Sequence, residues 1–271
     1  MKTRLLAAAV LVPILFLLVL VAPKGMAALV YSLLMAIAAY ELLYRTGLVR
    51  HNRLVLYSAI AAFAVTMWGY YGSVQAYLML GLLAFCLLLF AEMMMDHVKV
   101  RFEMLGMCFV AGFVVPFLLG SVIRILGMSI GRYVALVPFF VACINDAGAY
   151  FVGLKFGRHK LAPVVSPNKS IEGALGGIAV STVSMLLYAL FLDIFFPQFQ
   201  INYGYALLYG FCGSLAGIFG DLCFSVIKRQ TGIKDYGNLI PGHGGVLDRL
   251  DSMMTVAPLM EAFLLLIPFV V

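Results

Sequence analysis

A series of long apolar segments constrains the fold of this chain more than any other feature of its sequence. Nine windows, each bounded by charge, Gly or Pro, fall at Leu5–Val21, Met26–Tyr44, Leu54–Trp68, Ala76–Met95, Met104–Ile123, Tyr133–Val152, Gly173–Phe195, Tyr205–Ile227 and Met253–Val271. A membrane-spanning helix needs about 20 such residues. With 64% hydrophobic and 11% charged residues, the composition excludes an ordinary soluble domain. No window alternates as barrel strands do, so the sequence predicts an all-α, polytopic bundle of about nine transmembrane helices.

The basic residues predict the orientation of this bundle. If the N-terminus is cytoplasmic, 15 of the 18 Lys and Arg residues lie on the cytoplasmic side, and only Lys24, Arg124 and Arg132 lie on the other. Cytoplasmic loops of membrane proteins collect Lys and Arg. We therefore expect a multi-pass protein of the cell inner (plasma) membrane, with its N-terminus and its active site on the cytoplasmic side.

Two cytoplasmic loops are longer than a simple connection requires. They cover residues 153–172 and 228–252 and are rich in Gly, Pro and charged residues. Loops of this length in a compact bundle are usually functional or disordered. We therefore expect an N-terminal domain of about five spans, residues 1–130, and a C-terminal catalytic domain of about four spans, residues 131–271, that carries both loops.

Carboxylates inside spans are costly and mark candidate functional sites. Asp146 and Asp221 each lie one to two turns before a helix enters one of the two long loops. Small residues around both would let helices approach closely, and polar helix–helix contact is the alternative role. Glu41 and Glu92 lie near cytoplasmic helix ends, where an interfacial role and a role in a site are equally open.

The second long loop combines the features that binding a polyphosphate requires. It offers cations, glycines that let backbone N–H groups approach an anion, and carboxylates: Lys228, Arg229, Lys234, Arg249, Gly237, Gly242 to Gly245, Asp248 and Asp251. Oxygen ligands beside phosphate-binding cations favour Mg²⁺ over zinc or copper. His243 has no His or Cys partner, so a hydrogen bond or a phosphate contact suits it better than a transition metal.

Asp221 and Asp248 are 27 residues apart, which is enough chain for the loop to fold back over the helix ends. We expect the two carboxylates to meet at the cytoplasmic interface. Buried together without a cation they would be forced to protonate. Bound Mg²⁺ would remove that conflict and could bridge phosphate oxygens in a phosphoryl or nucleotidyl transfer.

The first long loop predicts a turn into a helix. Ser166-Pro167 is followed by Lys169, Ser170 and Glu172, with Ser170 or Ser166 as the N-cap. Beside four basic residues this segment indicates a second anion-binding edge. A solvated basic loop is the alternative interpretation.

The stretch from Ser225 to Asp251 resembles the phosphatidate cytidylyltransferase family, also called CDP-diacylglycerol synthases. The family pattern has thirteen fixed positions and one class position, matched at Ser225, Lys228, Arg229, Lys234, Asp235, Gly237, Ile240, Pro241, His243, Gly244, Gly245, Asp248, Arg249 and Asp251. Residues 146–150 with Gly153, and residues 166–173, are also similar to that family, although Asn168 stands where bacterial members often have a basic residue. The resemblance covers about the last half of the chain.

This resemblance implies a Mg²⁺-dependent reaction in which CTP and phosphatidate from the bilayer give CDP-diacylglycerol and pyrophosphate. It assigns Asp221, Asp248 and Asp251 to the metal, and Lys228, Arg229, Lys234, His243 and Arg249 to phosphates, with Ser225 in the substrate site. Asp146, Ser166, Lys169 and Glu172 are expected in the same cavity. Nucleic acid is not an expected partner, and a homodimer is among the oligomeric states left open.

Two other functions compete with this interpretation. A CTP-dependent lipid-alcohol kinase, such as a polyprenol kinase, could use the same metal and phosphate groups but would transfer the terminal phosphate. A secondary transporter could use Asp146 and Asp221 in an ion path. The sequence shows no inverted repeat or matched broken helices that would favour transport.

Overall fold

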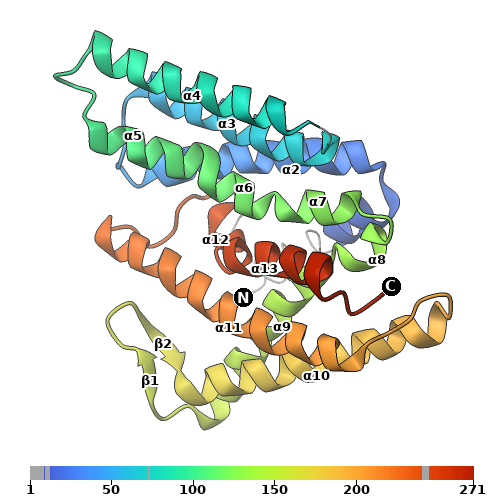
Figure 1. The fold of residues 1–271 in the computed structure, drawn as a ribbon. Helices are drawn as coiled ribbons and strands as arrows, with labels where there is room; N and C mark the ends of the chain where they lie inside the picture. Colours follow the sequence, from blue (N-terminus) through green and yellow to red (C-terminus); the bar gives the residue numbers. More distant parts are fainter. Residues whose placement is uncertain (1–8, 10–12, 73, 240–243) are drawn as a thin grey trace. The chain divides into compact units, whose positions relative to one another are not determined.

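The computed structural model describes residue 9 and residues 13–72, 74–239 and 244–271. Within these ranges the chain is almost entirely helical, apart from one short β-hairpin and one isolated bridge (Figure 1). It divides into two compact units, which are described separately. Unit 1 is Met1–Ala135 with Lys228–Leu250, and unit 2 is Leu136–Ile227 with Asp251–Val271. The division into functional domains 1–130 and 131–271 stays a prediction.

Unit 1 contains the N-terminal helices and the segment Lys228–Leu250, which we call the signature segment. Its elements are η1 (Leu17–Val21), α2 (Lys24–Tyr40), η2 (Glu41–Arg45), α3 (Asn52–Tyr71), α4 (Gln75–Met95), α5 (Phe102–Phe109), η3 (Val110–Val114), α6 (Val115–Leu119), α7 (Ser121–Gly127), α8 (Gly131–Val134) and α12 (Leu247–Leu250). Helix α3 packs against α2, α4 and η3. Gly112 permits the last contact, because a Cβ there would lie 3.0 Å from the Cα of Ser58.

Unit 2 contains the helices around the first long loop. Its elements are α9 (Val137–Phe156), β1 (Lys160–Ala162), β2 (Ser166–Ser170), α10 (Ile171–Phe195), α11 (Tyr203–Gln230) up to the unit boundary at Ile227, and α13 (Met253–Leu266). Strands β1 and β2 pair antiparallel, with Lys160 opposite Ser170. Helices α9 and α10 pack against each other over an extensive interface. Small residues bring the helices together, since a Cβ on Gly210 of α11 would lie 2.6 Å from the Cα of Thr182 in α10.

The last helix returns antiparallel to α11. Thr255 Oγ1 at the start of α13 donates a hydrogen bond to Ala216 O (2.6 Å), and the N–H of Gln200, before α11, donates to Val271 O (2.9 Å). The chain end therefore lies at the opposite end of α11 from Asp221. Helix α13 has 14 residues, or about 21 Å of helix, and the tail after it continues beside α11.

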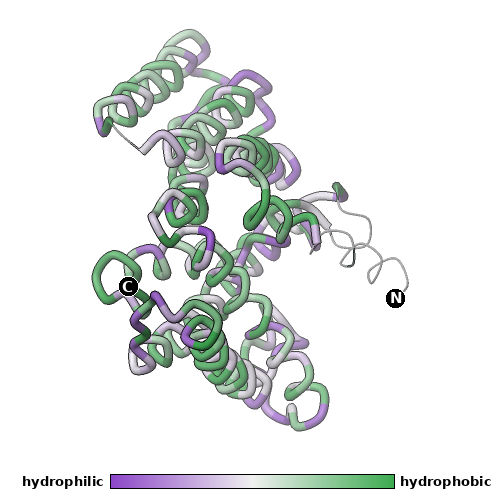
Figure 2. Tube along the Cα trace, turned by 90° about the vertical axis from the view of Figure 1, so that its right-hand side faces the viewer, coloured by the Kyte–Doolittle hydropathy of each residue, from purple (hydrophilic) through white to green (hydrophobic). Residues whose placement is uncertain are grey.

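The prediction of a polytopic helical membrane protein is confirmed. Seven helices of the described residues are long and apolar enough to cross a membrane: Lys24–Arg45, Asn52–Tyr71, Gln75–Met95, Phe102–Gly127, Gly131–Phe156, Ile171–Phe195 and Tyr203–Gln230. Figure 2 shows hydrophobic colour along the helices and hydrophilic colour mainly at their ends. Of the nine predicted windows, the first lies partly outside the described residues, and the ninth contains the shorter α13.

Candidate active site

A cavity of about 610 Å³ lies in unit 2 between α9, β2, α10 and α11. Polar side chains that line it include Asp146 on α9, Lys169 on β2 and Asp221 on α11. Apolar residues of α9 also line it, and two of them, Tyr150 and Leu154, are 64% and 74% exposed. The cavity therefore combines charged groups with apolar side chains that are open to the surroundings of the helix.

Asp221 and Lys169 form the ion pair of this cavity. The Lys169 ammonium contacts Asp221 Oδ2, and Ser225 Oγ, one turn further along α11, donates to Asp221 Oδ1 (3.2 Å). The Asp221 side chain is 21% exposed, and the Lys169 side chain is 28% exposed. A partly exposed pair is open to exchange, because an incoming cation or phosphate can replace either partner. The structure thus brings together three of the predicted site residues.

The hairpin β1–β2 positions Lys169, and two further predicted residues anchor the hairpin. Ser170 Oγ accepts a hydrogen bond from the N–H of Gly173 (3.1 Å), which confirms Ser170 as the N-cap of α10. Glu172 accepts from the N–H of Arg158 (3.0 Å) and pairs with His159 Nδ1 (2.6 Å). Glu172 therefore closes the base of the hairpin, while Ser166 begins β2 rather than capping a helix.

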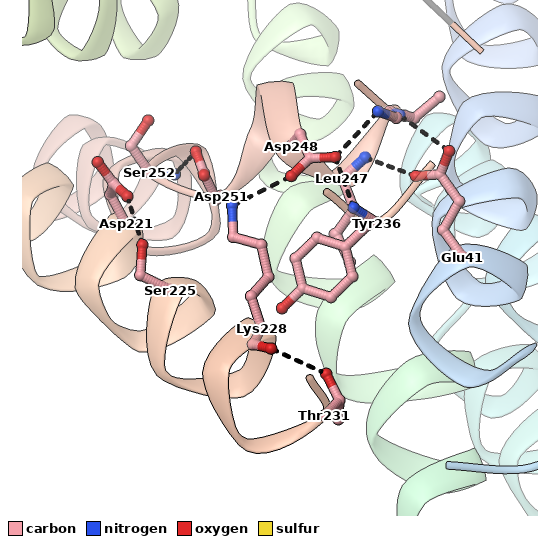
Figure 3. A network of polar contacts seen from close by, with 12 residues as sticks. Glu41, Asp221, Ser225, Lys228, Thr231, Tyr236, Leu247, Asp248, Asp251 and Ser252 are labelled. Carbon is pink, nitrogen blue, oxygen red and sulfur yellow. Dashed lines mark hydrogen bonds and ion pairs between the residues drawn. The ribbon is translucent and has the colours of Figure 1, made fainter. Parts of the chain in front are cut away.

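Asp248 is the centre of the signature segment in unit 1. Its Oδ1 accepts from Lys228 Nζ (3.1 Å), and its Oδ2 accepts from the backbone N–H groups of Tyr236 (2.7 Å) and Gly245 (2.9 Å) (Figure 3). The Asp248 side chain is only 2% exposed. The Lys228 ammonium also lies 5.4 Å from the centre of the Tyr236 ring. A buried carboxylate is thus satisfied by one cation and two backbone donors, as burial of a charge requires.

Glu41, at the start of η2, holds the same segment from the N-terminal helices. Its carboxylate accepts from the N–H groups of Val246 (3.1 Å) and Leu247 (2.9 Å), and the residue is 3% exposed. The sequence marked Glu41 as an intramembrane carboxylate but did not connect it with a loop 205 residues away. The signal that the sequence offered was the energetic cost of placing a carboxylate inside a membrane span.

Most of the other predicted site residues are exposed. Asp146, Arg229, Lys234 and Arg249 are exposed, and Asp251 Oδ1 accepts a hydrogen bond from the N–H of Ser252 (2.9 Å). His243 lies outside the described residues. Asp221 belongs to unit 2 and Asp248 to unit 1, so their expected meeting stays a prediction.

The carboxylates fit a magnesium ion by the type of donor they offer. No cluster of three or more His, Cys, Asp or Glu side chains occurs where the structure describes the chain. Mg²⁺ characteristically takes one or two carboxylates and completes its shell with water and substrate phosphates. Asp221 is the more accessible donor, because its side chain is 21% exposed and that of Asp248 is 2% exposed.

Comparison with known proteins gives a consistent result. A family model described as the cytidylyltransferase family matches residues 2–267. A phosphatidate cytidylyltransferase of Staphylococcus epidermidis is 33% identical over 267 residues, which is 98% of this chain and 99% of that protein. Another, from Staphylococcus haemolyticus, is 43% identical over 137 residues, or 51% of each chain.

Proposed function

This chain belongs to the cytidylyltransferase family, and we propose that its reaction takes place at the cavity beside Asp221 together with the signature segment around Asp248. The enzyme is a phosphatidate cytidylyltransferase, a membrane-embedded nucleotidyltransferase of phospholipid biosynthesis. It joins CTP and phosphatidate to give CDP-diacylglycerol and pyrophosphate. Neither the lipid-alcohol kinase nor the transporter has an observation in its favour.

The observation that best supports this location is the Lys169–Asp221 pair in a cavity that also has exposed apolar walls. Phosphatidate has an anionic head group and acyl chains, so it needs a cation next to an apolar surface. We assign Lys169 to a phosphate of the substrates. Asp146 and Ser225 are assigned to the same site, Asp146 as a lining residue and Ser225 through its bond to Asp221.

In this reaction the protein positions two polyanions, CTP and phosphatidate. It does not supply the nucleophile, which is an oxygen of phosphatidate. An oxygen of the phosphatidate phosphate attacks the α-phosphorus of CTP, and the bond from that phosphorus to the bridging oxygen breaks. Pyrophosphate leaves with the electron pair. Lys169 and Lys228, with Arg229, Lys234, His243 and Arg249 as further phosphate contacts, would offset the charge that accumulates as the polyanions approach.

Asp221 and Asp248, with Asp251 as a third ligand, are the groups that we propose hold Mg²⁺. When bound there, Mg²⁺ would offset the negative charge of the substrate phosphates. Chain connectivity supports the pairing, since Lys228, the partner of Asp248, follows Asp221 by seven residues along helix α11. Seven residues are about two turns, so both side chains lie on one face of that helix.

We further propose that the site faces the cytoplasm, where CTP is available. This orientation is supported by the basic residues, because it places 15 Lys and Arg residues on the cytoplasmic side and 3 on the other side. A homodimer is the oligomeric state to test, by native mass spectrometry of the purified enzyme in detergent.

One assay tests the reaction and separates it from the kinase. Purified protein is incubated with micelles of phosphatidate and, separately, of a polyprenol, and with CTP that is labelled in the cytidine or in the γ-phosphate, with and without Mg²⁺. We expect the cytidine label in the lipid and the γ label in pyrophosphate. A lipid that carries the γ-phosphate, with free CDP, would instead identify a kinase.

The proposed metal ligands are tested by Asp221→Asn and Asp248→Asn. Each removes the charge of one oxygen donor, so kcat should fall by about 100-fold or more. Asp193→Asn is the matched control and should retain activity. Asp193 lies near the far end of α10, where it accepts a hydrogen bond from Tyr203 (2.8 Å). Wild-type turnover in either site variant would contradict the assignment.

A further inference from the structure

We infer that Glu41 is a positioning residue of the active site, which holds the signature segment so that Asp248 and Lys228 take their working geometry. This inference rests on the proposed function, because that function gives Asp248 and Lys228 their roles. Glu41 lies where α2 passes into the π-helical turn η2 (Glu41–Arg45). Such π turns occur frequently at functional sites.

The hydrogen bonds form a continuous chain from Glu41 to Lys228. The N–H of Gly245 donates to Asp248, while the next two N–H groups, of Val246 and Leu247, donate to Glu41. Three consecutive backbone donors are thus divided between two buried carboxylates (Figure 3). Because Asp248 follows Leu247 directly, a shift of this backbone would move the Asp248 side chain and its bond to Lys228.

Two glycines of the signature segment are explained by contact with Glu41. A Cβ built on Gly245 would lie 2.5 Å from Glu41 Oε2 and 2.6 Å from its carboxyl carbon. A Cβ on Gly237 would lie 2.9 Å from the same carbon. Neither glycine has a positive φ, so the backbone conformation would tolerate alanine at both positions. At both positions the atoms nearest to an added Cβ belong to the Glu41 carboxylate, so alanine would press on that group.

A purely structural role for Glu41 makes a different prediction from a positioning role. As a structural group, Glu41 would lower the melting temperature when removed but leave kcat of the folded fraction unchanged. As a positioning group, it affects the rate of the folded enzyme. Its effect also depends on Gly245, because both act through the same backbone position.

The test measures CDP-diacylglycerol formation at saturating CTP and phosphatidate, together with thermal unfolding in detergent. We expect Glu41→Gln, which keeps the size of the side chain but turns a donor toward one backbone N–H, to lower kcat about tenfold or more in folded enzyme. Glu92→Gln is the matched control. Glu92 is equally buried at 3% exposure, but it pairs with His51 and Arg53, so its kcat should stay within about twofold of wild type.

A double-mutant cycle tests the contact between Glu41 and Gly245 by changing Gly245 as well. Gly245→Ala should also lower kcat, and Glu41→Ala should relieve that loss, because all three atoms nearest to the added methyl group belong to Glu41. The double variant should therefore be no slower than the slower single variant.

Three results would overturn the inference. The first is a wild-type kcat in folded Glu41→Gln, and the second is a double variant whose loss in kcat is the product of the two single losses. The third is that no Glu41 variant folds, which would make the contact a folding requirement only. The wild-type reaction in the same assay reports separately on the proposed function. If wild type forms no CDP-diacylglycerol, that function fails; if it does and the variants match it, only the positioning role fails.

Discussion

Lys169 shows how much of the proposed chemistry depends on single side chains. It neutralises Asp221 and lines the cavity, and under the proposed function it would also meet the charge of an incoming phosphate. The sequence placed Lys169 and Asp221 in one cavity through their resemblance to the family. It did not predict their direct pairing, because the two residues are 52 positions apart and on different elements.

The variant Lys169→Met tests the residue directly. It removes the ammonium but keeps most of the side-chain length, and we expect kcat/KM for phosphatidate to fall about 10- to 100-fold. Initial rates over a range of phosphatidate in mixed micelles measure the effect. Lys160→Met on β1 is the control, since Lys160 is exposed and lies outside the cavity lining. Equal losses in the two variants would show that only general surface charge matters.

At the scale of elements, glycines determine where the helices of unit 2 can meet. Alanine at Gly210 would place a methyl group 2.6 Å from the backbone of Thr182, so α10 and α11 would have to separate. We expect Gly210→Ala to lower the free energy of unfolding by about 2 kcal/mol.

Gly81→Ala provides the matched comparison for Gly210→Ala. Nothing lies within 4 Å of a Cβ at Gly81 on α4, so this change should be neutral or stabilise by about 0.5–1 kcal/mol through helix propensity. Thermal unfolding of both variants in detergent compares their losses of stability. A larger loss for Gly81→Ala than for Gly210→Ala would contradict the packing of α10 on α11.

The elements also show why sequence reasoning succeeded in part. Long apolar windows predicted the seven span-length helices, because lipid requires every backbone group to be satisfied within a helix. The hairpin was missed, since β1 has only three residues, too few to show an alternating pattern. The Glu41 contact was missed because one sequence contains no signal for a pairing over 205 residues.

At the scale of the whole molecule, the orientation in the membrane is open to a direct test. Val164, between β1 and β2, is 87% exposed and belongs to a predicted cytoplasmic loop, whereas Ser129 is exposed in a predicted outer loop. In a variant that lacks the five native cysteines, Val164→Cys should react with a membrane-impermeant maleimide in inside-out vesicles only. Ser129→Cys should react in intact cells. The reverse pattern would place the site on the outer face.

The assignment of the signature segment to the unit of the N-terminal helices has a practical consequence for hybrid enzymes. A chimera that takes its first helices from one relative and the rest from another would separate Glu41 from the backbone it binds at Val246 and Leu247. Such a graft should exchange both segments together. The N-terminal helices would then be taken from the same relative as the signature segment, and could not be exchanged on their own.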